Sequence, residues 1–457
     1  MIGAALSRWT MASFAVALVF LLGSQALMVA GFGFPAADMR APQTLILVHM
    51  VTIGWLSLLI CGALFQFVPV LVAKPLLHER LVLPSLLMLL AGLICLLCGF
   101  LHLTNLPQAA IVLLTGASLL LPAGFLLVVF VLGVTLWHAR PLPLPARFVA
   151  VGLASVGATL AFGALFALAL AGQITQPVLL DLHAASVPVH ATAGFIGWLS
   201  FTAIGVSYRL LPMFMLSPDD ERASGRVVLY AGSAALFLAI IAAPIEAITS
   251  GSAHSFHLAT MLALVALVAY AIDLARFYRL RKRRVIELNS KAALAAFAGL
   301  YLSALLFLIL SATNMLTEHA GALVYLVAFG WLSGLGLSQL YKIVPFLTWL
   351  ECYGPVMGRK KTPRVQDLVN ERRDSLWFAL YFIGVIVGTG ALLIEAPILF
   401  RLSAVATLVA TGAIVIELVR VRRLVNVETA LRLPEGTVLP RLFLPQRTQN
   451  ATIGATR

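Results

Sequence analysis

Charged side chains are scarce in this chain: Asp, Glu, Lys and Arg make up 11% of its 457 residues, whereas hydrophobic residues make up 61%. Together with a mean hydropathy of +1.02, this excludes an ordinary soluble globular protein. Cysteine is also rare, and four cysteines in such a chain do not suggest a disulfide framework. No part of the chain has the composition of a soluble domain.

Apolar runs long enough to cross a bilayer recur along the sequence. The first run is too long for a removed signal peptide and lacks a small-residue cleavage site. The sequence therefore predicts twelve membrane spans, at about 8–33, 43–73, 81–104, 108–137, 147–172, 183–215, 226–248, 255–279, 291–316, 319–350, 375–396 and 399–422.

Basic residues occupy alternate loops and the chain ends. All but four of the 31 Lys and Arg follow this rule, the exceptions being Arg40, Arg209, Lys342 and Arg401. The positive-inside rule then predicts a multi-pass protein of a bacterial inner (cytoplasmic) membrane with both termini cytoplasmic. The net charge of +13 is accounted for by topology, so the expected partner is the lipid bilayer and no nucleic acid is required. The polar segment 424–457 is expected to be a mobile cytoplasmic tail.

The tetrapeptide Gly-Trp-Leu-Ser occurs three times. Each copy is followed by an aromatic residue ten positions after its tryptophan and by a proline fourteen positions after it. The copies fall in the second, sixth and tenth predicted spans, at Gly54–Ser57, Gly197–Ser200 and Gly330–Ser333. The repeat predicts an all-α polytopic membrane protein whose twelve transmembrane helices form three pseudo-threefold four-helix arcs. The predicted domain is 1–423, with units at about 8–137, 147–279 and 291–422.

Histidine gathers at one level of the predicted membrane. Titratable groups inside a bilayer are costly and are therefore candidate functional residues, although histidine at helix ends is also explained by headgroup contact. The histidines that map to the outer third are His49, His102, His183, His190, His254, His257 and His319.

His49 and His190 are the deepest of these histidines, six and eight residues before Trp55 and Trp198. An offset of two residues rotates a side chain by about 200° on a helix. In a symmetric arrangement the two imidazoles would therefore point into different spaces and serve two sites.

Two further patterns are compatible with a metal. Cys95 and His102 are seven residues apart with Cys98 between them, and sulfur with imidazole suits Cu(I), although cysteine is also ordinary apolar filling in a membrane helix. His254 and His257 share a helix face, but no third ligand is fixed by the spacing. His183 and His190 complete the candidate metal ligands.

The motif helices resemble those of the catalytic subunit of heme–copper oxidases, in particular the cbb3-type oxidase and nitric oxide reductase branch. That family's tenth helix has the form His-x-His-x-x-x-x-Gly-Trp and ends at an aromatic-x-x-x-Pro. The segment Val189–Pro212 looks like the family's sixth helix, and His49–Pro69 looks like its second.

By this resemblance His49 corresponds to a ligand of the low-spin heme, and His190 corresponds to a ligand of the active-site copper. The two heme-ligand positions of the tenth helix instead hold Leu323 and Tyr325, with His319 a candidate substitute further out. The seventh span, Val227–Ile248, contains no histidine, whereas the family places two copper ligands there.

The resemblance implies bound heme, copper or both near the outer face, and a role in NO/O2 handling, redox sensing or support of a respiratory oxidase. A cytochrome c-type or other respiratory subunit is the implied protein partner. Two alternatives stay open: a copper or small-solute transporter, and a structural membrane subunit without cofactor. The incomplete ligand set leaves open whether the protein is an enzyme.

Overall fold

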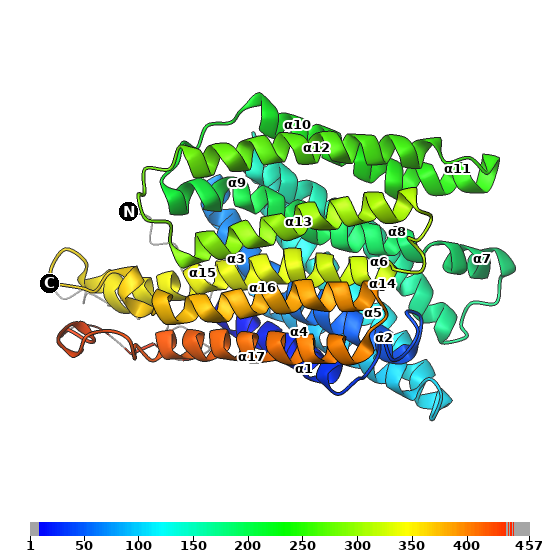
Figure 1. The fold of residues 1–457 in the computed structure, drawn as a ribbon, viewed down its shortest axis with the longest axis horizontal. Helices are drawn as coiled ribbons and strands as arrows, with labels where there is room; N and C mark the ends of the chain where they lie inside the picture. The colour runs from blue at the N-terminus through cyan, green and yellow to red at the C-terminus, as the bar shows by residue number, and fades with distance from the viewer. Residues whose placement is uncertain (1–8, 436, 438, 441, 443–457) are drawn as a thin grey trace, which may run out of the picture.

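The fold is a bundle of long helices that run side by side (Figure 1). The structure, a computed structural model, describes residues 9–435, 437, 439–440 and 442. Within these residues there is no strand, and twelve helical spans are long and apolar enough to cross a membrane, as predicted. The protein is therefore an all-α polytopic membrane protein.

Eight of the spans have one main helix each. These helices are α1 (Thr10–Val29), α4 (Val82–His102), α5 (Pro107–His138), α6 (Leu144–Leu170), α12 (His254–Arg279), α13 (Leu288–Ala312), α16 (Glu371–Leu393) and α17 (Pro397–Arg422). The remaining short helical segments are η2 (Glu79–Leu81), α7 (Pro177–Ala185), η6 (Gly354–Val356), η7 (Val365–Leu368) and η8 (Thr429–Leu431).

The other four spans contain a π-helical stretch between two α-helices. The second span is α2 (Pro42–His49), η1 (Met50–Ser57) and α3 (Leu58–Val72), and the sixth is α8 (Val187–Ala191), η3 (Thr192–Ser200) and α9 (Phe201–Met215). The seventh is α10 (Ala223–Phe237), η4 (Leu238–Ala242) and α11 (Ala243–Ser250), and the tenth is α14 (Ala320–Tyr325), η5 (Leu326–Ser333) and α15 (Gly334–Tyr353).

The Gly-Trp-Leu-Ser motifs lie in the second, sixth and tenth spans, as predicted, and each motif serine is the last residue of a π-helical stretch. The hydroxyl of Ser57 donates to the carbonyl of Thr52 at 2.8 Å, and that of Ser333 donates to Ala328 at 2.7 Å. Both acceptors lie five residues back, which is the spacing of a π-helical turn. The serine therefore supports the wide turn from inside the motif.

The three motifs join one another in a closed ring of hydrogen bonds. The indole nitrogen of each tryptophan donates to the hydroxyl of a serine in another motif. The pairs are Trp55 to Ser333 at 2.9 Å, Trp331 to Ser200 at 3.0 Å and Trp198 to Ser57 at 3.0 Å. All six side chains are at most 3% exposed. The ring therefore fastens the second, sixth and tenth spans together in the core.

Two of the motif glycines, Gly54 and Gly197, permit close approach of the helix that precedes their span. A Cβ on Gly54 would lie 2.5 Å from the ring of Phe20 in α1, and a Cβ on Gly197 would lie 2.5 Å from the hydroxyl of Ser155 in α6. Such distances are far inside van der Waals contact, so only glycine permits this approach. The first and second thirds of the chain thus share a motif glycine packed closely against the preceding helix, which agrees with their descent from one repeated unit.

Helix pairing recurs along the chain. The third and fourth helices of each predicted unit pack as neighbours, namely α4 with α5, α10 with α12, and α16 with α17. Equally, α1, α6 and α13 each pack on the motif span that follows them. The closed grouping of these helices into three arcs stays a prediction.

The polar tail begins as part of the packed protein, contrary to the expectation of mobility from residue 424. Leu424 and Val427 are 0% and 1% exposed, and the hydroxyl of Tyr353 donates to the carbonyl of Arg432 at 2.6 Å. These contacts hold the first turn after α17 against α15. Residues 436, 438, 441 and 443–457 of the predicted tail lie outside the described residues.

Candidate functional site

His49 is the last residue of α2 and immediately precedes the π-helical stretch of the second span. Its Nδ1 hydrogen bonds with the carbonyl of Leu45 at 2.8 Å, and its ring lies 5.4 Å from the ring of Phe100 in α4. A carbonyl oxygen only accepts, so Nδ1 donates this bond, and in the neutral imidazole Nε2 is then the unprotonated nitrogen that can bind a metal or a heme iron.

His190 lies in α8, just before the π-helical stretch of the sixth span. Its Nδ1 hydrogen bonds with the carbonyl of Thr159 in α6 at 3.0 Å. The ring of Phe166, also in α6, lies 5.3 Å from the imidazole and meets it edge-on. The ring of His190 is therefore oriented by a neighbouring helix, with the same nitrogen engaged as in His49.

His49 and His190 both lie just before a π-helical stretch, in the second and the sixth spans. The expectation from helical rotation is that they face different spaces. That expectation assumes α-helical geometry, whereas the π-helical stretch that follows each histidine contains the motif tryptophan, so it stays a prediction. The contact of η1 with η3 brings the two spans together at this level.

A glycine makes room beside His190. A Cβ on Gly163 in α6 would lie 3.2 Å from Cε1 of His190, tighter than ordinary contact. Two imidazoles from different spans, each with Nδ1 engaged and neither with a hydrogen bond at Nε2 among the described residues, are donors of the kind that bind heme iron. The phenylalanine rings of Phe100 and Phe166 lie against them. The donor chemistry of these side chains therefore suits heme iron.

The other predicted outer histidines do not join this pair in one ligand cluster. His183 contacts the ring of Phe166 at 5.0 Å between ring centroids, on the residue that also meets His190. His319 is 9% exposed at the start of α14. His254 pairs with Glu246 at 3.1 Å, and Nδ1 of His257 bonds with the carbonyl of Ala253 at 2.7 Å.

The sulfur residues of the third span stay apart from those histidines. Cys95 and Cys98 are free, half-buried residues of α4, and the sulfur of Cys95 lies towards Gly116 of α5. His102 ends α4. Among the residues that the structure describes, no three His, Cys, Asp or Glu side chains gather as a metal-binding group.

The two positions of the tenth span that the resemblance would assign to heme ligands hold Leu323, which is half-buried, and Tyr325, which is buried. Tyr325 is 7% exposed, and its ring packs 4.9 Å from Phe329 and 5.3 Å from Phe400. Tyr325 therefore packs against α17 through Phe400. The tenth span therefore contributes the Trp331 hydrogen bond and apolar packing at this level.

The sequence analysis did not identify two buried tyrosine–aspartate pairs, whose tyrosines lie after the motif in the sixth and tenth spans. Two of the aromatics ten positions after the motif tryptophans donate to carboxylates, Tyr208 to Asp273 at 2.8 Å and Tyr341 to Asp374 at 2.7 Å. The first motif span has Phe65 at this position and makes no such bond. The sequence did contain a signal for these pairs, namely an aspartate in or beside a predicted span together with a tyrosine at the repeated position of a motif span.

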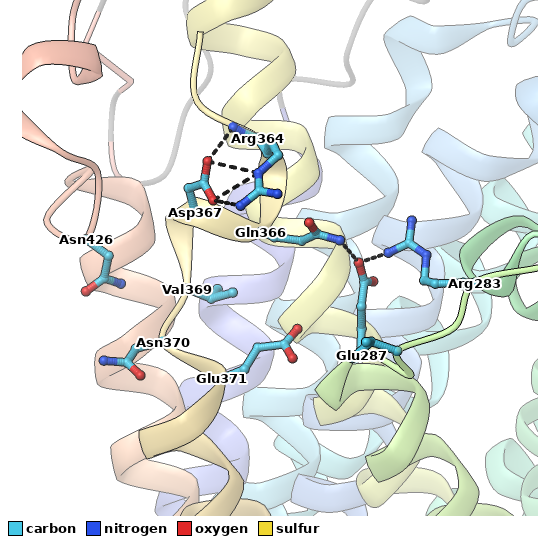
Figure 2. Close-up of a pocket in the computed structure, with 10 residues that line it drawn as sticks. Arg283, Glu287, Arg364, Gln366, Asp367, Val369, Asn370, Glu371 and Asn426 are labelled. Atoms are coloured by element: carbon cyan, nitrogen blue, oxygen red, sulfur yellow. Dashed lines mark hydrogen bonds and ion pairs between the residues drawn. The ribbon is translucent and has the colours of Figure 1, made fainter.

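Lys342, one of the four basic residues outside the predicted loops and chain ends, is held in an ion cluster. Its ammonium lies 2.6 Å from Glu287, which precedes α13 and is 5% exposed. Arg283 and Gln366 also bind the carboxylate of Glu287, and Figure 2 shows Glu287 between them. This cluster borders a polar pocket of about 570 Å³ at the end of the bundle that carries the loops before α10 and α13, called here the basic end.

The chain was compared with models of protein families and with curated proteins, and neither comparison finds a match.

Proposed function

We propose that this protein is a membrane heme protein in which His49 and His190 would hold the heme. The observation that carries the proposal is that two imidazoles, on spans that contact each other through η1 and η3, each have Nδ1 on a main-chain carbonyl. Metal-binding histidines characteristically have their second nitrogen engaged in this way, because it fixes the tautomer and the ring orientation.

The two ligands are held differently, and this difference supports a role in gas or redox handling. His49 is oriented by its own helix through Leu45, whereas His190 is oriented through Thr159 of α6 and packs on Phe166. Movement of α6 against the sixth span would therefore act on His190 alone. A heme held there would supply electron transfer and binding of NO or O2.

The proposed role is NO/O2 handling or redox sensing, and reduction of O2 to water is not proposed. A terminal oxidase needs an electron-entry heme beside a heme–copper pair. In this chain the corresponding positions of the tenth span hold Leu323 and Tyr325. The protein's own residues then have three tasks: binding the heme, orienting His190, and excluding water through the phenylalanine rings.

The test is the visible spectrum and metal content of the purified protein, oxidised and dithionite-reduced. We expect stoichiometric heme with a Soret band that is lost in His49→Ala and in His190→Ala. The control is His257→Ala, an exposed histidine at the same end of the bundle. Three results would contradict the proposal: a band that persists in both variants, copper without heme that depends on Cys95 or Cys98, or neither cofactor at stoichiometric level.

A further inference from the structure

An apolar groove of about 900 Å³ lies between α12 and α13. Its walls come from both helices and include Leu264, Val268 and Ile272 of α12 and Leu305 and Leu308 of α13. Val268, Ile272 and Leu305 are each more than half exposed, so the groove opens sideways towards lipid. Ala271, Ala275 and Ala304 also line the groove, and their small side chains leave it wide.

The groove lies at one of the three junctions at which the last helix of a predicted unit adjoins the first helix of another. The last helix of the first predicted unit, α5, packs directly on the first helix of the next, α6, and α17 packs on α1 in the same way. The corresponding pair is α12 and α13. Here the hydroxyl of Tyr301 donates to the carbonyl of Leu267 at 2.9 Å, and the groove extends from that bond. The repeat therefore leaves a gap at this junction that helix packing closes at the other two.

One end of the groove is lined by three arginines, Arg222, Arg276 and Arg279. Arg276 is neutralised by Asp220 at 2.7 Å, and the hydrogen bond from its guanidinium holds the pKa of that carboxyl below its usual range. Arg222 and Arg279 are exposed and form no ion pair within the described part of the chain. Among the described residues the mouth is therefore lined by three arginines and by no acidic side chain, and the charge of Asp220 acts on Arg222 as well as on Arg276.

The length of the groove matches one leaflet. From Leu264 to Arg279 the helix rises by about 22 Å at about 1.5 Å per residue. Half of a bilayer with its headgroup regions is about 20–22 Å thick. A transmembrane helix of a partner would need an apolar surface of about 30 Å, so the groove is too short for a whole span.

We propose that this groove is a binding site for one anionic phospholipid. Its acyl chains lie between α12 and α13, and its phosphate is bound by Arg222 and Arg279. Cationic pockets between transmembrane helices at one membrane face are suited to anionic lipid headgroups, because the apolar wall and the charge are recognised together. A zwitterionic lipid offers the same chains with no net negative charge and would bind less tightly.

Native mass spectrometry of the detergent-purified protein, titrated with phosphatidylglycerol or with phosphatidylcholine, tests the proposal. We expect one phosphatidylglycerol to be retained, and the double variant Arg222→Gln with Arg279→Gln to weaken its binding by roughly tenfold or more. The matched control is Arg226→Gln with Arg284→Gln, which removes the same charge from exposed arginines at the same end but outside the groove. That control is expected to retain the lipid.

A second variant tests the apolar part without touching charge. Ala275→Phe with Ala304→Phe fills the groove and is expected to abolish retention while all three arginines remain. Three results overturn the proposal: equal loss in the two arginine pairs, equal retention of the two lipids, or a Leu305→Cys variant that crosslinks in native membranes to a polypeptide. The last result would assign the groove to a protein partner.

Discussion

The indole nitrogen of Trp55 donates to the hydroxyl of Ser333 at 2.9 Å across 278 residues of sequence. The same bond is made from Trp331 to Ser200 and from Trp198 to Ser57, so each motif both donates to one neighbour and accepts from the other. Because each bond links two different spans, removing one opens the ring without breaking any single helix. The ring is thus a measurable property of the tertiary fold.

Opening the ring should destabilise the protein by the cost of one unsatisfied buried group. Ser200→Ala leaves the indole N–H of Trp331 without its acceptor, and we expect a loss of about 1–3 kcal/mol. Thermal unfolding in detergent, followed by size-exclusion chromatography, measures it. Trp331→Phe combined with Ser200→Ala should cost less than the sum of the two single changes, because the donor and acceptor are then both absent. Strict additivity would show that the bond contributes nothing.

Gly163→Val should perturb the proposed heme site through His190. The added side chain begins 3.2 Å from Cε1 of the imidazole, so the ring must tilt and its bond to Thr159 must lengthen. We expect a shifted Soret band or partial loss of heme in the visible spectrum. Gly157→Val, in the same helix, is the control, because nothing lies within 4 Å of a Cβ there. Identical spectra for both variants would count against the placement of the site.

Tyr208→Phe should destabilise the second motif span. It removes one hydrogen bond from the buried carboxylate of Asp273, which keeps a bond from Ser224. The expected loss is about 1–3 kcal/mol in thermal or denaturant unfolding. Tyr230→Phe is the control, because Tyr230 is 62% exposed and its change should fall within about 0.5 kcal/mol. A loss no larger than that of the control would mean that the bond to Asp273 is not needed.

Removing the negative charge of the ion cluster in Figure 2 should destabilise the protein more than removing one of its positive charges. Glu287→Gln leaves Lys342 and Arg283 without their carboxylate, and losing one side of a buried pair costs about 3–5 kcal/mol. Lys342→Gln, which places the amide that the first motif span has at Gln66, leaves Glu287 with two partners. We therefore expect Lys342→Gln to retain more folded protein after heating. The reverse order would contradict the proposed role of Glu287 as the centre of the cluster.

The sequence by itself determined the number and course of the spans. A membrane span must satisfy its own backbone within a continuous apolar run, so composition and length are sufficient to locate it. The motif placed its three copies correctly in the second, sixth and tenth spans for the same reason. His49 and His190 could be singled out because a titratable imidazole at that depth in the membrane is costly and is therefore a candidate functional residue.

Only the tertiary structure decided how these residues meet. The sequence does not distinguish the π-helical stretches from α-helix, because a wide turn changes hydrogen-bond spacing without changing composition. Those stretches redirect the side chains around them, so a rotation argued from about 100° per residue does not hold through the second and sixth spans. The bond from Trp55 to Ser333 and the groove between α12 and α13 likewise depend on packing between distant segments, which no local pattern encodes.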